Sequence, residues 1–192
     1  MMVKIFNPKK FEKLNDPIRL EHLPPVFIKE KLEIQEAKVI VDVGAGTGFF
    51  SLHFANMFHD SKVYACDISD FMVNYMKDKV VPVNPRIHPL LMEHDTIPLG
   101  DGLADLIVMI NLHHEIEDPE KILLECYRLL KPGGKIAISD WKKEDTGHGP
   151  ALEIRFETGE VEVQLAESGF IAISSFDELK LNFLVIGEKP SI

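Results

Sequence analysis

Residues 39–48 constrain the fold of this chain more than any other stretch, and they read Val-Ile-Val-Asp-Val-Gly-Ala-Gly-Thr-Gly. The run of β-branched residues that opens it suits a strand buried on both faces of a sheet. The alternating glycines let the backbone turn sharply and leave room for a ligand to approach. Residues 49–58 then place apolar side chains at helical spacing. A strand, a glycine loop and a helix in this order predict the nucleotide-binding corner of an open α/β sheet.

The spacing of the glycines separates the possible ligands. A dinucleotide fingerprint, G-x-G-x-x-G, requires its third glycine where Phe49 stands. A phosphate-binding P-loop requires Gly-Lys-Ser/Thr at its end, and this loop ends differently. The pattern Asp-x-Gly-x-Gly-x-Gly instead resembles the first motif of class I S-adenosylmethionine (SAM)-dependent methyltransferases. That resemblance implies SAM as the cofactor, with Asp42 near its positively charged amino-acid end, directly or through water. The loop residues implied to hold it are Gly44, Ala45, Gly46 and Gly48.

A second acid stands where a ribose would need it. Residues 62–67 read as a strand that ends in Asp67, which follows Gly46 by 21 residues. An acid about 20 residues beyond a glycine loop is placed to accept hydrogen bonds from ribose hydroxyls. We therefore expect Asp67 to bind the ribose, with Ile68 packing on the adenine. The alternative is that Asp67 caps the helix expected over 71–79, although Ser69 is also suited to cap that helix.

The segment 87–99 is expected to reach the adenine. Pro89 lies inside an apparent strand, which indicates an edge position in the sheet. Related methyltransferases often carry Gly-Asp-Ala-Glu-x-Leu-Pro here. Alignment on Ile97-Pro98 places Glu93 at the family's Asp, which accepts a hydrogen bond from the adenine amino group. The backbone N–H of His94 is then implied to meet an adenine ring nitrogen. Because Glu is longer than the family's Asp, Asp95 competes for this role. Two solvated loop acids are the alternative.

The segment from 103 to 141 resembles the fourth strand, Leu-His-His and Leu-Lys-Pro-Gly-Gly elements of the same family. Asn111 follows the strand expected over 103–110, where ligands of open α/β sheets bind. A core-facing helix is expected over 121–130, with residues 131–134 as the turn that ends it and 135–141 as the fifth strand.

Both ends of the chain are expected to complete the fold. Residues 1–36 are predicted to form an N-terminal helical cap, with a helical turn over 9–14 and a Pro-initiated helix within 23–32. Residues 37–192 are predicted to form the methyltransferase domain. Near its end, Thr158 is expected to cap a helix over 159–168, followed by a hairpin of 170–176 and 180–186. The resemblance implies an α/β, Rossmann-like class I fold: a seven-stranded, mostly parallel sheet with helices on both faces and a C-terminal antiparallel hairpin whose last strand lies between strands five and six.

Composition limits the class of partner. The 192 residues suit one domain, and the net charge of −10 disfavours a nucleic-acid substrate. The sequence contains no apolar run of the ~18 residues that a membrane span needs, and the N-terminus lacks the apolar core of a signal peptide, so we expect a cytoplasmic protein. Cys66 and Cys126 are expected as small core residues. No metal is expected, because no metal-ligand spacing occurs.

The expected function is transfer of a methyl group from SAM to a small-molecule acceptor. If the acceptor must lose a proton, a general base is needed, and the candidates are His113, His114 and His148, with Glu115 and Asp140 as further options. Packing beside the cofactor is the alternative for the two adjacent histidines. The chain is similar to the ubiquinone/menaquinone-type methyltransferase group. Two alternatives remain for the function: methylation of a protein substrate, and SAM binding without methyl transfer. An enzyme that uses a nicotinamide cofactor is a more distant alternative. The oligomeric state stays open, with a homodimer as one possibility.

Overall fold

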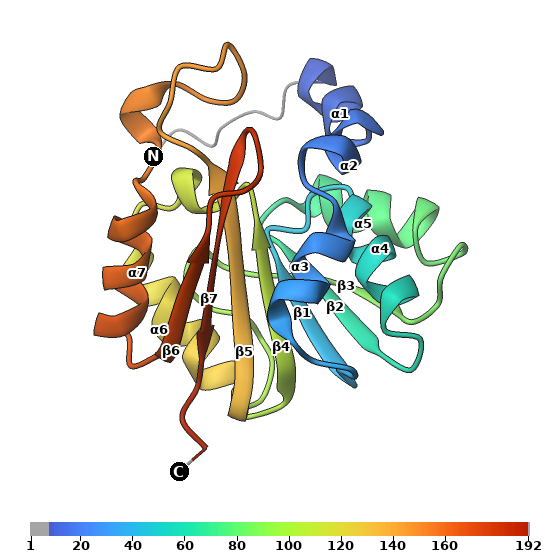
Figure 1. Cartoon of the computed structure of the whole chain (residues 1–192). Helices are drawn as coiled ribbons and strands as arrows, with labels where there is room; N and C mark the ends of the chain where they lie inside the picture. The colour runs from blue at the N-terminus through green and yellow to red at the C-terminus, as the bar shows by residue number, and fades with distance from the viewer. Residues whose placement is uncertain (1–7, 192) are drawn as a thin grey trace.

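The computed structural model describes residues 8–191, so the first seven residues of the predicted cap lie outside the described part of the chain. Within these residues one sheet of seven strands has the order β3-β2-β1-β4-β5-β7-β6 (Figure 1). The strands are β1 (Val39–Val43), β2 (Lys62–Asp67), β3 (Ile87–Leu91), β4 (Ala104–Ile110), β5 (Leu130–Trp141), β6 (Ile171–Phe176) and β7 (Asn182–Glu188).

The first five strands are parallel, and β7 runs antiparallel to both β5 and β6. The C-terminal hairpin therefore inserts its last strand between the fifth and sixth strands, as predicted. The strand β3 pairs with β2 alone, so Pro89 lies on an edge strand, where its missing N–H leaves no ladder bond unmade.

Helices cover both faces of the sheet, which confirms the predicted Rossmann-like arrangement (Figure 1). Ile40 packs in the core beneath α3, α4 and α5, while the next residue, Val41, packs in the core beneath α6 and α7. Successive strand residues thus face opposite cores, which explains the continuous apolar run in β1. The helices are α1 (Pro8–Leu14), α2 (Ile18–His22), α3 (Pro25–Leu32), α4 (Phe49–Met57), α5 (Asp70–Lys79), α6 (Pro119–Leu129) and α7 (Thr158–Glu167), with short 3-10 turns η1 (His113–Glu115) and η2 (Leu152–Ile154).

Two local expectations are wrong. Residues 131–134 do not form a turn but continue β5, and the register shift between Ala104 and Leu106 accommodates them. Glycine suits position 134 because any other residue would bring a Cβ to 3.0 Å from the Ala104 carbonyl oxygen, which is too close for an ordinary contact. The helix α7 is capped by Glu157 and not by Thr158, since Glu157 and Glu160 form a reciprocal capping box that satisfies two backbone N–H groups.

The helices α1 and α2 lie at the end of the sheet where the parallel strands finish, whereas α3 packs on one face of the sheet (Figure 1). In Figure 1, α1 and α2 lie on one side of that end and the loop between β5 and α7 lies on the other. The turn of helix expected over 9–14 corresponds to α1, and Pro25 begins α3 at its first turn. The short α2 was not predicted. Across residues 8–191, none of the helices has the length and apolar character needed to cross a bilayer.

Candidate cofactor and acceptor site

The strand order creates one topological switch point in the sheet, where a ligand crevice can form. The chain leaves β1 for β2 and β3 and returns on the other side of β1 as β4. Loops that leave neighbouring strands in opposite directions open a ligand crevice at the carboxyl ends of those strands. The glycine loop follows β1 and Asn111 follows β4, so the sequence-predicted residues meet at this point.

Three glycines shape the loop that follows β1. Gly44, Gly46 and Gly48 have φ values of +71°, +57° and +75°, a region that other residues rarely adopt. A Cβ at Gly44 would lie 2.6 Å from Leu112, whereas a Cβ at Gly46 would meet, among the described residues, Leu14 alone, at 3.8 Å. The loop therefore packs closely at Gly44 and is open at Gly46, which leaves room for a ligand at the latter.

The structure joins Asp67 to the glycine loop. Asp67 Oδ2 accepts the Gly46 N–H at 2.8 Å, and Oδ1 accepts the Ser69 N–H at 2.9 Å. Burial raises the pKa of Asp67, and these two N–H groups oppose that shift. Ser69 Oγ accepts from Met72 N and caps α5, so the alternative role of Asp67 as the helix cap is wrong. Ile68 is 55% exposed, which leaves its side chain available to a planar ring.

Asp42 is a buried acid beneath the same loop. It is 2% exposed, and Ser51 Oγ donates to its Oδ2 at 2.5 Å. Burial raises the pKa of Asp42 to about 7, with the nearby charge of Asp67 adding to this, while the Ser51 hydrogen bond and Arg19 oppose it. At neutral pH this carboxyl is therefore only partly ionised, and a cationic ligand group beside it would favour loss of its proton.

The loop after β3 carries the two residues expected near adenine. Glu93 and His94 are both exposed at the carboxyl edge of the sheet, and the Glu93 N–H bonds the Thr96 carbonyl at 3.0 Å. The competing acid, Asp95, lies near enough to Lys121 of α6 to help raise the pKa of that lysine, after the larger effect of Asp118.

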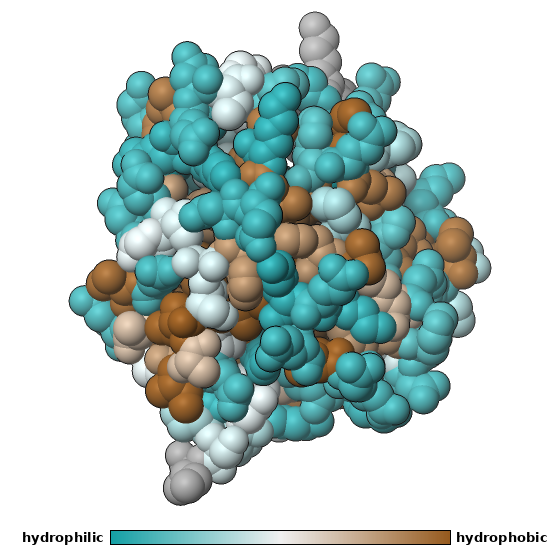
Figure 2. All heavy atoms as spheres, viewed as in Figure 1, coloured by the Kyte–Doolittle hydropathy of each residue, from teal (hydrophilic) through white to brown (hydrophobic). Residues whose placement is uncertain are grey.

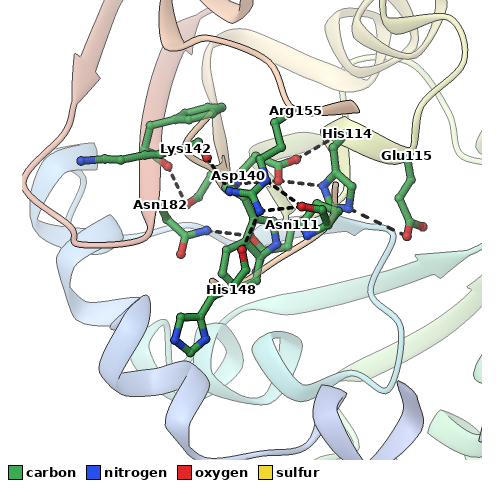
Figure 3. A network of polar contacts seen from close by, with 12 residues as sticks. Asn111, His114, Glu115, Asp140, Lys142, His148, Arg155 and Asn182 are labelled. Carbon is green, nitrogen blue, oxygen red and sulfur yellow. Dashed lines mark hydrogen bonds and ion pairs between the residues drawn. The ribbon is translucent and has the colours of Figure 1, made fainter. Parts of the chain in front are cut away.

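Beyond β4, two polar pairs connect the strand ends. Asn111 has φ +52°, and its Oδ1 accepts from Asn182 Nδ2 at 2.7 Å (Figure 3). Asp140, at the end of β5, accepts the His114 backbone N–H at 3.0 Å and meets His114 Nδ1 at 2.8 Å. This geometry favours the His114 tautomer with its proton on Nδ1, because a carboxylate oxygen accepts hydrogen bonds. Glu115 lies 3.9 Å from the other ring nitrogen, Nε2.

The three candidate histidines occupy different environments. His113 is fully buried, with Nε2 2.7 Å from the Gln164 side-chain oxygen and its ring against Phe156. Burial lowers the pKa of His113, so it packs as a neutral ring. His148 turns away from Asp140 in Figure 3, and its ring contacts that of His22 on α2 at a centroid distance of 5.8 Å. Of the three, only His114 is held by a carboxylate at a strand end.

Arg155 organises the loop between β5 and α7, a role that sequence reasoning missed. The residue is 6% exposed, and its guanidinium donates to four carbonyl oxygens of that loop. Those carbonyls belong to Lys142, Glu144, His148 and Pro150. A hollow of about 310 Å³ beside His114 is lined by Arg155 together with Lys143 and Phe156. A lone arginine in a polar loop carries no sequence signal, because carbonyl acceptors can come from any residue.

Within residues 8–191, no three His, Cys, Asp or Glu side chains are grouped so that they could hold an ion. Cys66 and Cys126 are buried and unpaired in strand and helix, as expected of core residues.

Comparison with known proteins identifies the class. A family model described as a methyltransferase domain matches residues 41–138, just over half of the chain. The crystal structure of a SAM-dependent methyltransferase from Aquifex aeolicus is 35% identical, with a TM-score of 0.88 over 95% of this chain and 98% of that one. This chain therefore belongs to the class I SAM-dependent methyltransferases.

Two further relatives are more distant. A crystal structure from Sulfolobus solfataricus, assigned to the type 11 methyltransferases, is 27% identical with a TM-score of 0.69, over 93% of this chain and 95% of that one. The ubiquinone/menaquinone biosynthesis C-methyltransferase of Enterobacter sp. (strain 638) is 25% identical over 139 residues, 70% of this chain and 55% of that protein. The chain spans about half the length of the curated relatives it matches.

The residues at the crevice fit the cofactor of this family. The open side of Gly46 admits a close approach to the backbone, and Asp67 is a buried acceptor beside it. Asp42 supplies a carboxyl for a cationic group, and Ile68 an exposed apolar surface for a flat base. SAM carries an α-ammonium, a ribose diol and adenine, and each of these three groups has a chemically matched group here.

Proposed function

We propose that this chain transfers the methyl group of SAM to a small-molecule acceptor. The hydrogen bond from Gly46 N–H to Asp67 carries the proposal, because it brings the glycine loop and the ribose-binding acid into one crevice. The proposed cofactor contacts are Asp42, Gly44, Ala45, Gly46 and Gly48 on the first loop, and Asp67, Ile68, Glu93, His94 and Asn111 on the neighbouring ones.

The methyl acceptor is proposed to bind beside Asn111 and His114. SAM supplies an activated methyl group when it is bound. The protein has to hold the acceptor atom in line with that group and exclude water. In the proposed mechanism Asn182 fixes Asn111, and Asp140 fixes the His114 ring with its Nε2 available to take a proton from the acceptor. His113 and His148 support the site through packing.

The N-terminal helices are proposed to act as a cover over this crevice, with 37–192 as the domain that binds the cofactor. Leu14 of α1 lies 3.8 Å from the Cβ position of Gly46, and His22 of α2 contacts His148 of the opposite loop. Both contacts support a cover above the carboxyl edge of the sheet. A cover built this way encloses a small acceptor more readily than a folded protein.

Charge and surface character support a small molecule over a nucleic acid. The net charge is −10, and Figure 2 shows hydrophilic residues over most of the face it presents. Phosphate binding needs clustered Lys and Arg. We also propose the cytosol as the compartment, since both cysteines are unpaired. A protein acceptor, attracted by the acidic surface, is the second candidate.

Two measurements test the function. Calorimetry with S-adenosylhomocysteine should show binding, and [methyl-³H]SAM incubated with a metabolite extract should yield a labelled small product. Binding without any labelled product would indicate a SAM-binding protein that does not transfer, and label in protein bands would indicate a protein substrate. Absence of binding at millimolar concentration would refute the proposal, and light scattering on the same sample distinguishes monomer from homodimer.

A further inference from the structure

Arg19 on α2 is a cation held beside the glycine loop. Its Nη1 donates to the Leu14 carbonyl at 2.6 Å, and its guanidinium carbon lies 4.6 Å from the centre of the Phe50 ring and 5.3 Å from that of Phe49. Phe49 and Phe50 are the first two residues of α4, directly after Gly48. The N-terminal cover therefore places a positive charge at the point where the loop becomes a helix.

Within the described part of the chain, no carboxylate forms an ion pair with this guanidinium. Among residues 8–191, none lies within ion-pair distance of Arg19, although the charge of Asp42 acts on it through space. Its Nε and Nη2 groups donate to no acceptor in the same part of the chain. Burial lowers the pKa of Arg19 to about 10, and the charge of Asp42 only partly opposes this shift. A cation in this position is poorly compensated unless a ligand supplies an anion.

The surroundings add to the positive character. The first turn of α4 contains no acid, and its N-cap, Gly48, has no side chain to accept a hydrogen bond. Unpaired N–H groups make a helix N-terminus partly positive. Asp42, the acid whose charge acts on Arg19, is already bonded to Ser51. An anionic group would therefore be stabilised on the Arg19 side, and a cationic one on the Asp42 side.

The amino-acid end of the proposed cofactor carries both charges. Its ammonium suits Asp42, and its carboxylate has no partner among the residues assigned so far. We propose that the guanidinium of Arg19 binds this carboxylate and so fastens the N-terminal cover over the cofactor. The inference rests on the proposed cofactor binding and adds a residue that recognises the carboxylate.

Binding of the carboxylate by Arg19 would also affect the acceptor side of the crevice, through α2. Arg19 and His22 lie on the same short helix, and the His22 ring contacts His148 of the loop that Arg155 organises. Binding of the carboxylate would hold α2 in place and with it this contact. The cover would then be most ordered when the complete amino-acid part of the cofactor is present.

A double-difference binding experiment tests the pairing. Calorimetry compares S-adenosylhomocysteine with its decarboxylated analogue, on the wild-type protein and on Arg19→Met. We expect the wild type to bind the complete ligand about tenfold or more tightly than the analogue, the range expected for a charge-assisted hydrogen bond. Arg19→Met should abolish that preference and leave the affinity for the analogue within about twofold. Arg19→Lys should restore part of the preference.

Lys29 provides a matched control. Its ammonium also lies over an aromatic ring, Phe58, at 4.8 Å, and it donates to the Met57 carbonyl, but at the opposite end of α4. Lys29→Met should keep the full preference for the complete ligand. An equal loss of affinity for both ligands in Arg19→Met, or an unchanged preference, would overturn the role of Arg19. Failure of the wild type to bind either ligand would instead refute the proposed function.

Hydrogen exchange on the wild-type protein gives an answer even where a variant folds poorly. The complete ligand should slow amide exchange in residues 18–23 by several-fold relative to the decarboxylated analogue, with both ligands at saturation. Equal protection of 18–23 by the two ligands would show that the cover does not respond to the carboxylate.

Discussion

Gly46 donates its backbone N–H to Asp67 over 2.8 Å, across 21 residues of chain. The acid that is proposed to bind the ribose thus also fixes the loop that is proposed to receive the methionine part. Loss of the carboxylate should therefore change both ligand binding and the order of the loop, which a solvated acid would not do.

Asp67→Ala should weaken binding of S-adenosylhomocysteine by about 1–3 kcal/mol, the scale of a hydrogen bond to a charged group. Asp67→Asn, which keeps an acceptor for Gly46, should lose less. Calorimetry measures both. Asp78→Ala, an exposed acid on α5, is the control and should bind as the wild type does. An Asp67→Ala protein with wild-type affinity would show that the ribose assignment is wrong.

Gly44 and Gly46 should respond differently to alanine. Both substitutions force a residue with a Cβ into the left-handed region, at a cost of about 1–2 kcal/mol. At Gly44 the Cβ also lies 2.6 Å from Leu112, so Gly44→Ala should be the less stable variant in thermal unfolding. Gly46→Ala should keep more of its stability yet lose cofactor affinity, because its Cβ enters the open side of the loop. Normal binding by Gly46→Ala would contradict this geometry.

Asp42 should make the cofactor-free protein less stable as the pH rises. Its pKa is about 7 in the folded protein, above the value of about 3.9 in an unfolded chain. The folded state therefore holds this proton more tightly, and the associated stability, fully present below pH 4, is lost as the pH rises to about 7. Asp42→Asn cannot ionise and should become more stable than the wild type, by about 2–4 kcal/mol above pH 7. Urea unfolding at pH 5, 7 and 8.5 measures this, and a pH-independent difference would contradict it.

The same acid should link cofactor binding to pH. A ligand ammonium beside Asp42 lowers its pKa, so binding expels a proton from the fraction of molecules that hold one. Affinity for S-adenosylhomocysteine should therefore rise up to about pH 7 and then level off. Calorimetry in buffers of different ionisation enthalpy detects the released proton, and Asp42→Asn should release none.

The His114–Asp140 pair should control proton removal. Asp140→Asn replaces an acceptor with a group that can also donate, so the imidazole loses the partner that fixes its tautomer. We expect a fall of about 10²-fold or more in the rate of methyl transfer for His114→Gln, the range of general-base catalysis. Nitrogen-15 NMR should show the proton of His114 on Nδ1 in the wild type and a changed tautomer in Asp140→Asn. His59→Gln, on an exposed loop, should leave the rate unchanged, and an equal rate in His114→Gln would exclude the general-base role.

Arg155 should govern the acceptor loop without affecting the cofactor. Arg155→Met removes donors to four carbonyl oxygens, and residues 142–155 should then exchange their amide hydrogens faster. The KM for the acceptor should rise while the affinity for S-adenosylhomocysteine stays within about twofold. Unchanged exchange in the loop would mean that other contacts hold it.

Several features of the site followed from the sequence because their signals are local. The glycine loop, the strand before it and the helix after it are adjacent in the chain, and the spacing to Asp67 follows from the length of one strand–helix–strand unit. The edge position of β3 followed from Pro89 alone, because proline lacks the N–H that a central strand must supply. The turn expected at 131–134 is instead an irregular part of β5, whose pairing with β4 passes from Leu130 directly to Lys135.

The sequence by itself indicated the individual strands and helices, since periodicity and the backbone requirements of glycine and proline act over a few residues. The order of the strands and the class of cofactor were implied by the resemblance of its motifs to those of class I methyltransferases. Only the tertiary structure decided which side chains meet. It separated His114, held by Asp140 across 26 residues, from its neighbour His113 in the core, and it joined Asn111 to Asn182 across 71 residues. It also placed Arg19 beside the glycine loop. Such contacts depend on how whole elements pack, and no local pattern in the chain specifies them.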